Sequence, residues 1–358
     1  VCLSTGGGFN CSIWQGHAGG TVNNFTGDYN GDGLTDIAAY TGAGVDWVVC
    51  FSTGSGFNCQ PRQIHSAGHT NNITADFDGD GRTDMAGYVG NGVWGLCLAR
   101  STGFSCGYEN AHGGGLSNNV VGDFNGDGKS DLVGYAGNGV YAVCLSTGSG
   151  FNCVTWNGHA GGTANNLTGD FNGDGLTDMA AYTNSGKSWH VCLSTGKAFS
   201  CSFHEINSLG SQYSFVADFN GDGRSDIARY NENGEWRVCF GAGETFSCSN
   251  YPGHSGGYLN NIVGDFNGDG KVDLAGYAGG PNWHVTLSSF DMRERIASVS
   301  TPYVDDVFSI QYKYLTDGSV YVKDTGANAA ALPLIDGQYA LHVVSAVTKK
   351  TGNGDVTS

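Results

Sequence analysis

Proline, basic residues and long apolar runs are scarce in this sequence. Only 5 of its 358 residues are proline, and 16 are lysine or arginine. No apolar run reaches the roughly 18 residues of a membrane-spanning helix, so membrane insertion is not expected. Nucleic-acid binding is not expected either, because phosphate contacts depend on basic residues and the formal net charge is −17. No secretory leader is recognisable and the chain starts at Val1, so we expect a processed product or a piece of a longer protein.

Glycine is abundant instead. The 61 glycines lack the Gly-X-Y period of collagen, which indicates many tight turns. Aromatic residues make up 12% of the chain and hydrophobic residues 39%, which is enough to bury a core. A disordered chain is therefore not expected.

The sequence repeats with a period of 47 or 48 residues. An acidic loop marks each unit, and its first residues are Asp28, Asp76, Asp123, Asp170, Asp218 and Asp265. Each unit has four short apolar segments without helical periodicity, in the first unit 23–27, 37–40, 47–51 and 57–59. Four strands in such a period match a β-propeller blade, so we predict an all-β propeller over 1–289. A solenoid of stacked units is the alternative.

The number of blades has two interpretations. Six acidic loops are present, and a cysteine-bearing hairpin at 1–14 precedes the first of them. This hairpin either completes the last blade of six or belongs to a seventh blade that begins upstream of Val1. A further third-strand segment, 283–287, has Thr286 where the other units have cysteine. We predict six blades.

The 12 cysteines form six pairs with partners nine positions apart. The pairs are Cys2/Cys11, Cys50/Cys59, Cys97/Cys106, Cys144/Cys153, Cys192/Cys201 and Cys239/Cys248. This spacing sets the partners opposite each other in an antiparallel hairpin, with Cα atoms about 4.5–5.5 Å apart. Zinc sites favour tighter spacings, so we predict one hairpin disulfide per blade and a secreted or cell-surface protein. Free thiols that pack as small apolar side chains are the alternative.

The acidic loops share a nine-residue pattern. They read DYNGDGLTD (28–36), DFDGDGRTD (76–84), DFNGDGKSD (123–131), DFNGDGLTD (170–178), DFNGDGRSD (218–226) and DFNGDGKVD (265–273). Oxygen-bearing side chains occupy positions 1, 3, 5 and 9, and position 7 can offer its carbonyl. Ca²⁺ takes six to eight oxygen ligands, and its loops require glycine at position 6. The loops hold 19 of the 33 acidic residues, so six Ca²⁺ ions would offset 12 of the 17 net negative charges.

We therefore predict about six Ca²⁺ ions, one in each loop. The predicted ligands are Asp28, Asn30, Asp32, Leu34, Asp36, Asp76, Asp78, Asp80, Arg82, Asp84, Asp123, Asn125, Asp127, Lys129, Asp131, Asp170, Asn172, Asp174, Leu176, Asp178, Asp218, Asn220, Asp222, Arg224, Asp226, Asp265, Asn267, Asp269, Lys271 and Asp273. Mg²⁺ prefers a stricter octahedron with several waters, and the loops contain no His or Cys for zinc or copper. An Asn/Asp-Gly turn without metal is the alternative. The twelfth-position Glu of an EF-hand is missing, so we expect permanent braces rather than sensors.

Two family resemblances follow from these motifs. The repeated DxNGDGxxD loop between strands resembles the FG-GAP/VCBS repeats of integrin-α-like propellers, which implies a calcium ion that stiffens each blade and is not catalytic. Residues 310–321 and 341–347 resemble the segment that follows the propeller in SpvB-like proteins and toxin-complex B subunits. In those relatives the segment leads into a YD/Rhs-repeat shell, so we assign 290–358 to a separate β-strand segment.

A histidine recurs in the connector after most hairpins. These residues are His17, His65, His112, His159 and His254, and an Asn pair follows each of them. They form either glycan-binding pockets between blades, as in a lectin, or polar contacts that satisfy backbone groups between blades. A tryptophan recurs on most third strands, where we expect it to pack between blades.

Function follows from these assignments. We predict no catalytic residues, because the repeated carboxylates are assigned to metal and no G-x-S-x-G, H-E-x-x-H or phosphate-loop motif is present. The leading hypothesis is a secreted binding or assembly module of a larger toxin-complex-like or YD-repeat protein, whose partner is a protein or a neighbouring domain. A glycan-binding lectin or adhesin is the alternative. A glycosidase is the least favoured, because no acid/base pair is evident outside the metal loops.

Overall fold

The regular elements of the protein are β-strands. A computed structural model describes residues 1–4, 9–16, 24–40, 46–64, 72–101, 103–112, 119–159, 166–182, 188–206, 214–231, 234–243, 245–253, 261–267, 271–279, 282–288, 298–301, 304–314, 342–351 and 354–357. Within these ranges no helix is long and apolar enough to cross a membrane. The predicted all-β class is confirmed.

Five sheets have the same four-stranded antiparallel order, each built from consecutive strands. Their strands are β3 (Asn24–Gly27), β4 (Asp36–Tyr40), β5 (Asp46–Ser52) and β6 (Phe57–Gln63); β7 (Asn72–Ala75), β8 (Asp84–Gly90), β9 (Val93–Arg100) and β10 (Gly103–Asn110); β11 (Asn119–Gly122), β12 (Asp131–Gly137), β13 (Val140–Ser146) and β14 (Phe151–Asn157); β15 (Leu167–Gly169), β16 (Asp178–Tyr182), β17 (Ser188–Ser194) and β18 (Phe199–Glu205); and β19 (Ser214–Ala217), β20 (Asp226–Asn231), β21 (Glu235–Gly241) and β22 (Phe246–Pro252). Each sheet is one repeat of the sequence.

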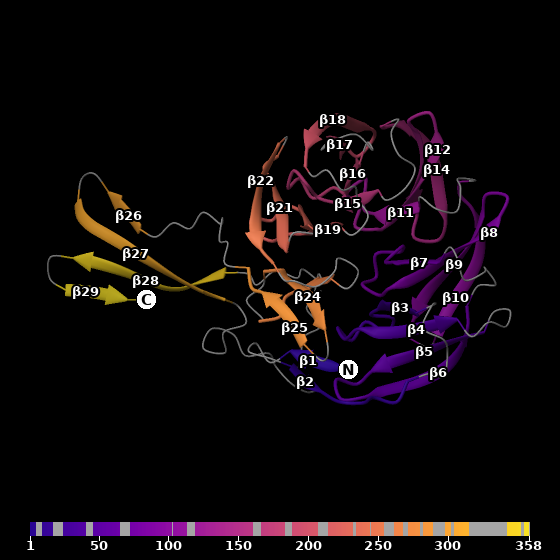
Figure 1. The fold of residues 1–358 in the computed structure, drawn as a ribbon, viewed down its shortest axis with the longest axis horizontal. Coiled ribbons are helices and arrows are strands. Elements are labelled where there is room, and N and C mark those ends of the chain that lie inside the picture. The colour runs from indigo at the N-terminus through magenta and orange to yellow at the C-terminus, as the bar shows by residue number, and fades with distance from the viewer. Residues whose placement is uncertain are drawn as a thin grey trace.

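A sixth sheet contains β23 (Asn261–Gly264), β24 (Asp273–Gly279) and β25 (Asn282–Thr286). Figure 1 shows the six sheets following one another around a ring, from the indigo first blade to the orange sixth. The first strands of successive blades contact one another from β3 to β19, which places them on the inside of the ring. The protein is therefore a six-bladed β-propeller, as predicted.

The N-terminal hairpin forms a small sheet of its own. It pairs β1 (Cys2–Ser4) with β2 (Phe9–Cys11), and the described part of the sixth blade keeps three strands. Strand β25 already occupies the third-strand place of that blade, where Trp283 lies opposite Tyr277. Among the described strands, the hairpin therefore does not extend the sheet of the sixth blade.

Apolar side chains pack between neighbouring blades. In the first cluster, Trp47 and Val49 of the first blade contact Met85 and Cys97 of the second, and four similar clusters follow around the ring. The third-strand tryptophans of four blades are 0% exposed: Trp47, Trp94, Trp189 and Trp236. The recurring tryptophans thus act in blade packing, because a single four-stranded sheet cannot bury its own faces.

Disulfides join the third and fourth strands of five blades. The bridges are Cys50–Cys59, Cys97–Cys106, Cys144–Cys153, Cys192–Cys201 and Cys239–Cys248. The partners lie directly opposite each other in register, with Cα atoms 3.8–4.0 Å apart, closer than the expected separation. Cys11 is also disulfide-bonded, and the register of the N-terminal hairpin places Cys2 opposite it.

The strands after the propeller form a separate four-stranded antiparallel sheet. It contains β26 (Ser298–Thr301), β27 (Val304–Tyr314), β28 (His342–Thr351) and β29 (Gly354–Thr357). Figure 1 shows this yellow sheet apart from the ring. The division of the chain after residue 289 stays a prediction.

Candidate metal-binding loops

Each acidic loop connects the first and second strands of its blade. In the first blade the innermost strand β3 ends at Gly27 and β4 begins at Asp36, the ninth position of the loop. The glycines at positions 4 and 6, here Gly31 and Gly33, have φ angles of +76° and +82°. This left-handed backbone favours glycine, and it turns the loop back on itself.

The carboxylate at position 1 organises the loop. Asp28 accepts hydrogen bonds from the backbone N–H groups of Gly31 (2.7 Å), Asp32 (3.2 Å) and Gly33 (2.7 Å). The same three bonds recur at the loops that begin with Asp76, Asp123, Asp170 and Asp218. The backbone of each of these loops therefore wraps around a single carboxylate, through hydrogen bonds that do not involve an ion.

Positions 3 and 5 face each other across the turn. In the first loop the Nδ2 group of Asn30 donates to Asp32 at 2.9 Å, and the Oδ1 atom of Asn30 accepts from the backbone N–H of Asp32. Asp32 in turn accepts from the backbone N–H of Leu34 at 2.8 Å. These contacts bring the side-chain oxygens of both positions to one side of the loop.

The carboxylate at position 9 connects the loop to the third strand. In the fifth blade, Asp226 accepts from the backbone N–H groups of Phe219 (2.9 Å) and Gly241 (2.8 Å). All six ninth-position residues make the equivalent pair of bonds and are 0% exposed: Asp36, Asp84, Asp131, Asp178, Asp226 and Asp273. The sequence pattern predicts only a metal-binding role for position 9. In the structure, this position also connects the acidic loop to the third strand of its blade.

Burial changes the acidity of these ninth-position groups. It raises the pKa of Asp36 and Asp131 to about 6, of Asp84 and Asp178 to about 7, and of Asp226 to about 8, although backbone hydrogen bonds act in the opposite direction. Neighbouring carboxylates of the same loop raise each pKa further. A cation in the loop would favour the ionised form of these groups.

Successive loops are bonded to one another around the ring. The backbone N–H of Thr83, at position 8 of the second loop, donates to the carbonyl of Asp28 at 2.7 Å. Equivalent bonds connect Ser130 to Asp76, Thr177 to Asp123 and Ser225 to Asp170 at 2.6–2.8 Å. We call these linked loops of the first five blades the loop belt.

Small residues make this close approach possible. A Cβ atom on Gly27 would lie 2.5 Å from the side chain of Thr83, and one on Gly122 would lie 2.4 Å from Thr177. At the outer side, the hydroxyl of Ser194 donates to the carbonyl of Phe124 in the preceding loop at 2.6 Å. The recurring Thr or Ser at position 8 and the recurring Ser at the end of the third strand mark these contacts in the sequence, but they do not show which loop each residue contacts.

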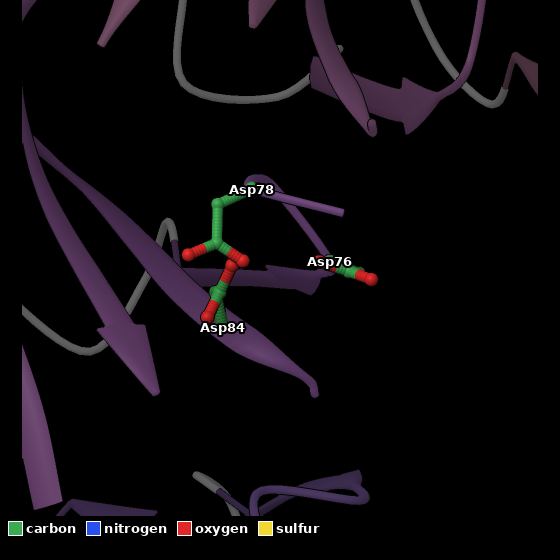
Figure 2. A group of neighbouring side chains, drawn as sticks. All are labelled: Asp76, Asp78 and Asp84. Carbon is green, nitrogen blue, oxygen red and sulfur yellow. The ribbon is translucent and has the colours of Figure 1, made fainter. Parts of the chain in front are cut away.

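The donor set fits a hard divalent cation. Asp76, Asp78 and Asp84 each offer an oxygen atom, and these atoms lie within 4.8 Å of one another. Figure 2 shows the carboxylates of Asp78 and Asp84 directed toward each other, with Asp76 to one side. Crowded carboxylates of this kind favour a nearby positive charge, and their oxygen atoms are ligands that suit Ca²⁺. Of the predicted ligands, Asp269 lies outside the described residues, and calcium itself stays a prediction.

The two described connector histidines are packed inside the propeller. His112 is 4% exposed, its ring lies 5.5 Å from that of Trp94, and burial lowers its pKa to about 4. His159 is 1% exposed and forms a hydrogen bond with the hydroxyl of Tyr141. This geometry favours the packing interpretation for both residues. His17, His65 and His254 lie outside the described residues, so their glycan-binding role stays a prediction.

The chain has similarity to a repeat family and to solved structures. Residues 218–276 match the FG-GAP-like repeat. This segment contains the fifth and sixth acidic loops, so the predicted repeat resemblance is supported there. No curated protein matches the chain.

The most informative structural likeness is to the Tc holotoxin pore of Photorhabdus luminescens. It has a TM-score of 0.55 at 16% identity, and covers 94% of this chain and 17% of that chain. A TcdB2–TccC3 structure without its hypervariable C-terminal region gives 0.46 at 13% identity, covering 93% and 17%. The Vibrio cholerae biofilm matrix protein Bap1 gives 0.33 at 15% identity, covering 92% and 57%. The first likeness concerns the fold, and this chain spans about one sixth of that protein's length.

Proposed function

We propose that this chain is a calcium-stabilised propeller that serves as an assembly or protein-binding module of a larger, secreted, toxin-complex-like protein. The observation that carries the proposal is the loop belt. Four backbone hydrogen bonds of 2.6–2.8 Å join one loop to the next, in addition to the apolar clusters between blades. The loop belt is therefore a rigid surface. Rigidity suits the docking of a protein partner better than it suits an active site that has to move.

Calcium has a specific place in this proposal. Each loop has at least three carboxylates in its sequence, and the ninth-position carboxylates are buried. An ion in each loop would neutralise these groups and hold positions 1, 3, 5 and 9 of the loop together. Since the loops are bonded to one another, the ions would stiffen the ring as a whole.

The larger context rests on the extent of the structural likeness. Nearly the whole chain, 94%, aligns with 17% of a Tc holotoxin chain, so the fold occurs there as one part of a larger protein. Five disulfides in the described blades fit an oxidising compartment, which supports secretion. Together these features favour a scaffold that contacts other domains.

A cleavage experiment on the full-length protein tests the assembly role. A specific protease site is inserted between Ser288 and Ser298, and the cut protein is analysed by size-exclusion chromatography with Ca²⁺ present. An assembly module stays associated with the rest of the protein after cleavage, and dissociates when Ca²⁺ is chelated. If the cut propeller elutes alone, folded and with its calcium bound, the assembly role is wrong.

A further inference from the structure

The second acidic loop departs from the others at two places at once. Its third position is Asp78, whereas the five other loops have Asn there. In the second blade, the third-strand residue that donates to position 9 is Ala99, and the next residue is Arg100. The first, third and fourth blades have threonine at the place of Arg100, namely Thr53, Thr147 and Thr195. One change adds a negative charge to the loop, and the other adds a positive charge beside it.

The two changed side chains are in contact. The Nη1 atom of Arg100 lies 2.5 Å from Asp78 Oδ2 and 3.2 Å from Asp80 Oδ2. The guanidinium therefore bridges positions 3 and 5, which are two of the side chains that a cation in this loop would use. The side chain of Asp78 is 10% exposed and that of Arg100 is 39% exposed, so solvent screens this pair mainly from the arginine side.

The backbone directs Arg100 toward the loop. The N–H of the preceding residue, Ala99, donates to Asp84 at 2.6 Å, which anchors this end of the third strand to the ninth position. In the third and fourth blades the threonine at the same place donates instead to a carbonyl of its own hairpin turn, Thr147 to Gly150 and Thr195 to Ala198. At this place the second blade therefore has a side chain that contacts the acidic loop, whereas the third and fourth blades have one that contacts the hairpin turn.

A second arginine adds to the difference. Arg82, at position 7, pairs with Asp80 at 2.7 Å, so two guanidinium groups face the four carboxylates of this loop. The third and fifth loops have one such pair each, Lys129–Asp127 at 3.3 Å and Arg224–Asp222 at 3.4 Å. Position 7 is thus a shared feature of several loops, and Arg100 is the feature particular to the second.

We propose that Arg100 is an internal cation that closes the second loop without metal, so that this loop binds Ca²⁺ more weakly than the others. The inference rests on the proposed calcium function of the loops. A Ca²⁺ ion entering the second loop has to displace the guanidinium from Asp78 and Asp80 or bind beside it, and both cost free energy. Once Arg100 is removed, the extra carboxylate of Asp78 makes the same loop a stronger site.

Calcium titration of the whole chain tests this inference. Decalcified protein is titrated with Ca²⁺ by isothermal calorimetry, and bound calcium is counted by mass spectrometry after dialysis against buffered free Ca²⁺. The wild type is expected to show one site that fills last. Arg100→Thr is expected to raise the affinity of that site roughly tenfold. Arg100→Lys, which keeps the positive charge, is expected to stay near the wild type.

The control is Lys350→Thr, which removes one positive charge from strand β28 of the sheet that follows the propeller. It is expected to leave every site unchanged. Equal filling of all sites in the wild type, with no change in Arg100→Thr, would overturn the inference while leaving calcium binding intact. If no variant binds calcium, the proposed calcium function fails as well, so the two failures are distinguishable. If Arg100→Thr does not fold, the Arg100→Lys variant and the wild-type filling order still decide the question.

Discussion

The fifth and sixth blades share one plan but differ in completeness. The fifth has four strands and a disulfide, and its Trp236 is 0% exposed. The described part of the sixth has three strands and Thr286 in place of cysteine, and its Trp283 is 44% exposed. Both nevertheless keep the bonds from position 9, since Ser288 donates to Asp273 at 2.7 Å and Gly241 donates to Asp226 at 2.8 Å.

This difference separates two layers of the propeller. The inner layer, formed by the acidic loop and the first three strands, keeps its position-9 bonds in both blades, although only three strands of the sixth lie within the described residues. The fourth strand and its disulfide lie outside this layer, and the third-strand tryptophan Trp236 is buried in the fifth blade, where it shares an apolar cluster with Val272 and Leu274 of the sixth. We infer that the acidic loops determine the rigidity of the loop belt. The fourth strands determine how much apolar surface each blade buries.

The largest effect is expected from the tryptophans. Trp236→Ala should lower the free energy of unfolding by about 3–5 kcal/mol, because it leaves a cavity between two blades. Trp283→Ala should cost only about 1 kcal/mol, because its side chain is already partly in water. Chemical denaturation of both variants measures the contrast, and equal losses would contradict the separation of layers.

An intermediate effect is expected at position 9. Asp226→Ala and Asp273→Ala should each cost about 2–4 kcal/mol, because each leaves two backbone N–H groups without an acceptor. The loss should be similar in the two blades, unlike that of the tryptophans. Denaturation in EDTA isolates this effect from calcium, and Asn variants, which keep one acceptor, should lose less. A loss confined to the fifth blade would show that the bonds depend on the outer hairpin.

The smallest effect is expected from the outer bridge. Removing Cys239 and Cys248 together by Ala substitution should cost about 2 kcal/mol, because the bridge closes a loop of about ten residues. In the sixth blade, Thr286→Cys has no partner in the described strands and should change stability by less than about 0.5 kcal/mol. Thermal unfolding of both variants provides the comparison. A loss of calcium from the double Ala variant would contradict the independence of the two layers.

Several features of the fold are predictable from the sequence. The period of 47 or 48 residues sets the blades, and the nine-residue cysteine spacing sets the hairpin register, which the structure has as Cys144 opposite Cys153. These features depend on contacts between residues close in sequence, so local patterns are sufficient to find them.

Other features depend on contacts between distant segments. Ser194 bonds to Phe124 across 70 positions, and Thr83 bonds to Asp28 across 55. No local pattern shows that position 8 of one loop reaches position 1 of the loop before it. The burial of His112 and the pairing of Arg100 with Asp78 have the same origin, because each side chain meets its partner only after strands have been brought together.

The role of calcium in stabilising the propeller can be tested by thermal unfolding with and without EDTA. The protein is first reduced to open its disulfides, and its calcium content is counted. One Ca²⁺ ion for each loop is expected at saturating calcium. Chelation is expected to lower the melting temperature by at least about 10 °C, because the ions bind the folded loops alone. A protein that contains no calcium and melts at the same temperature in EDTA would show that calcium does not stabilise the propeller.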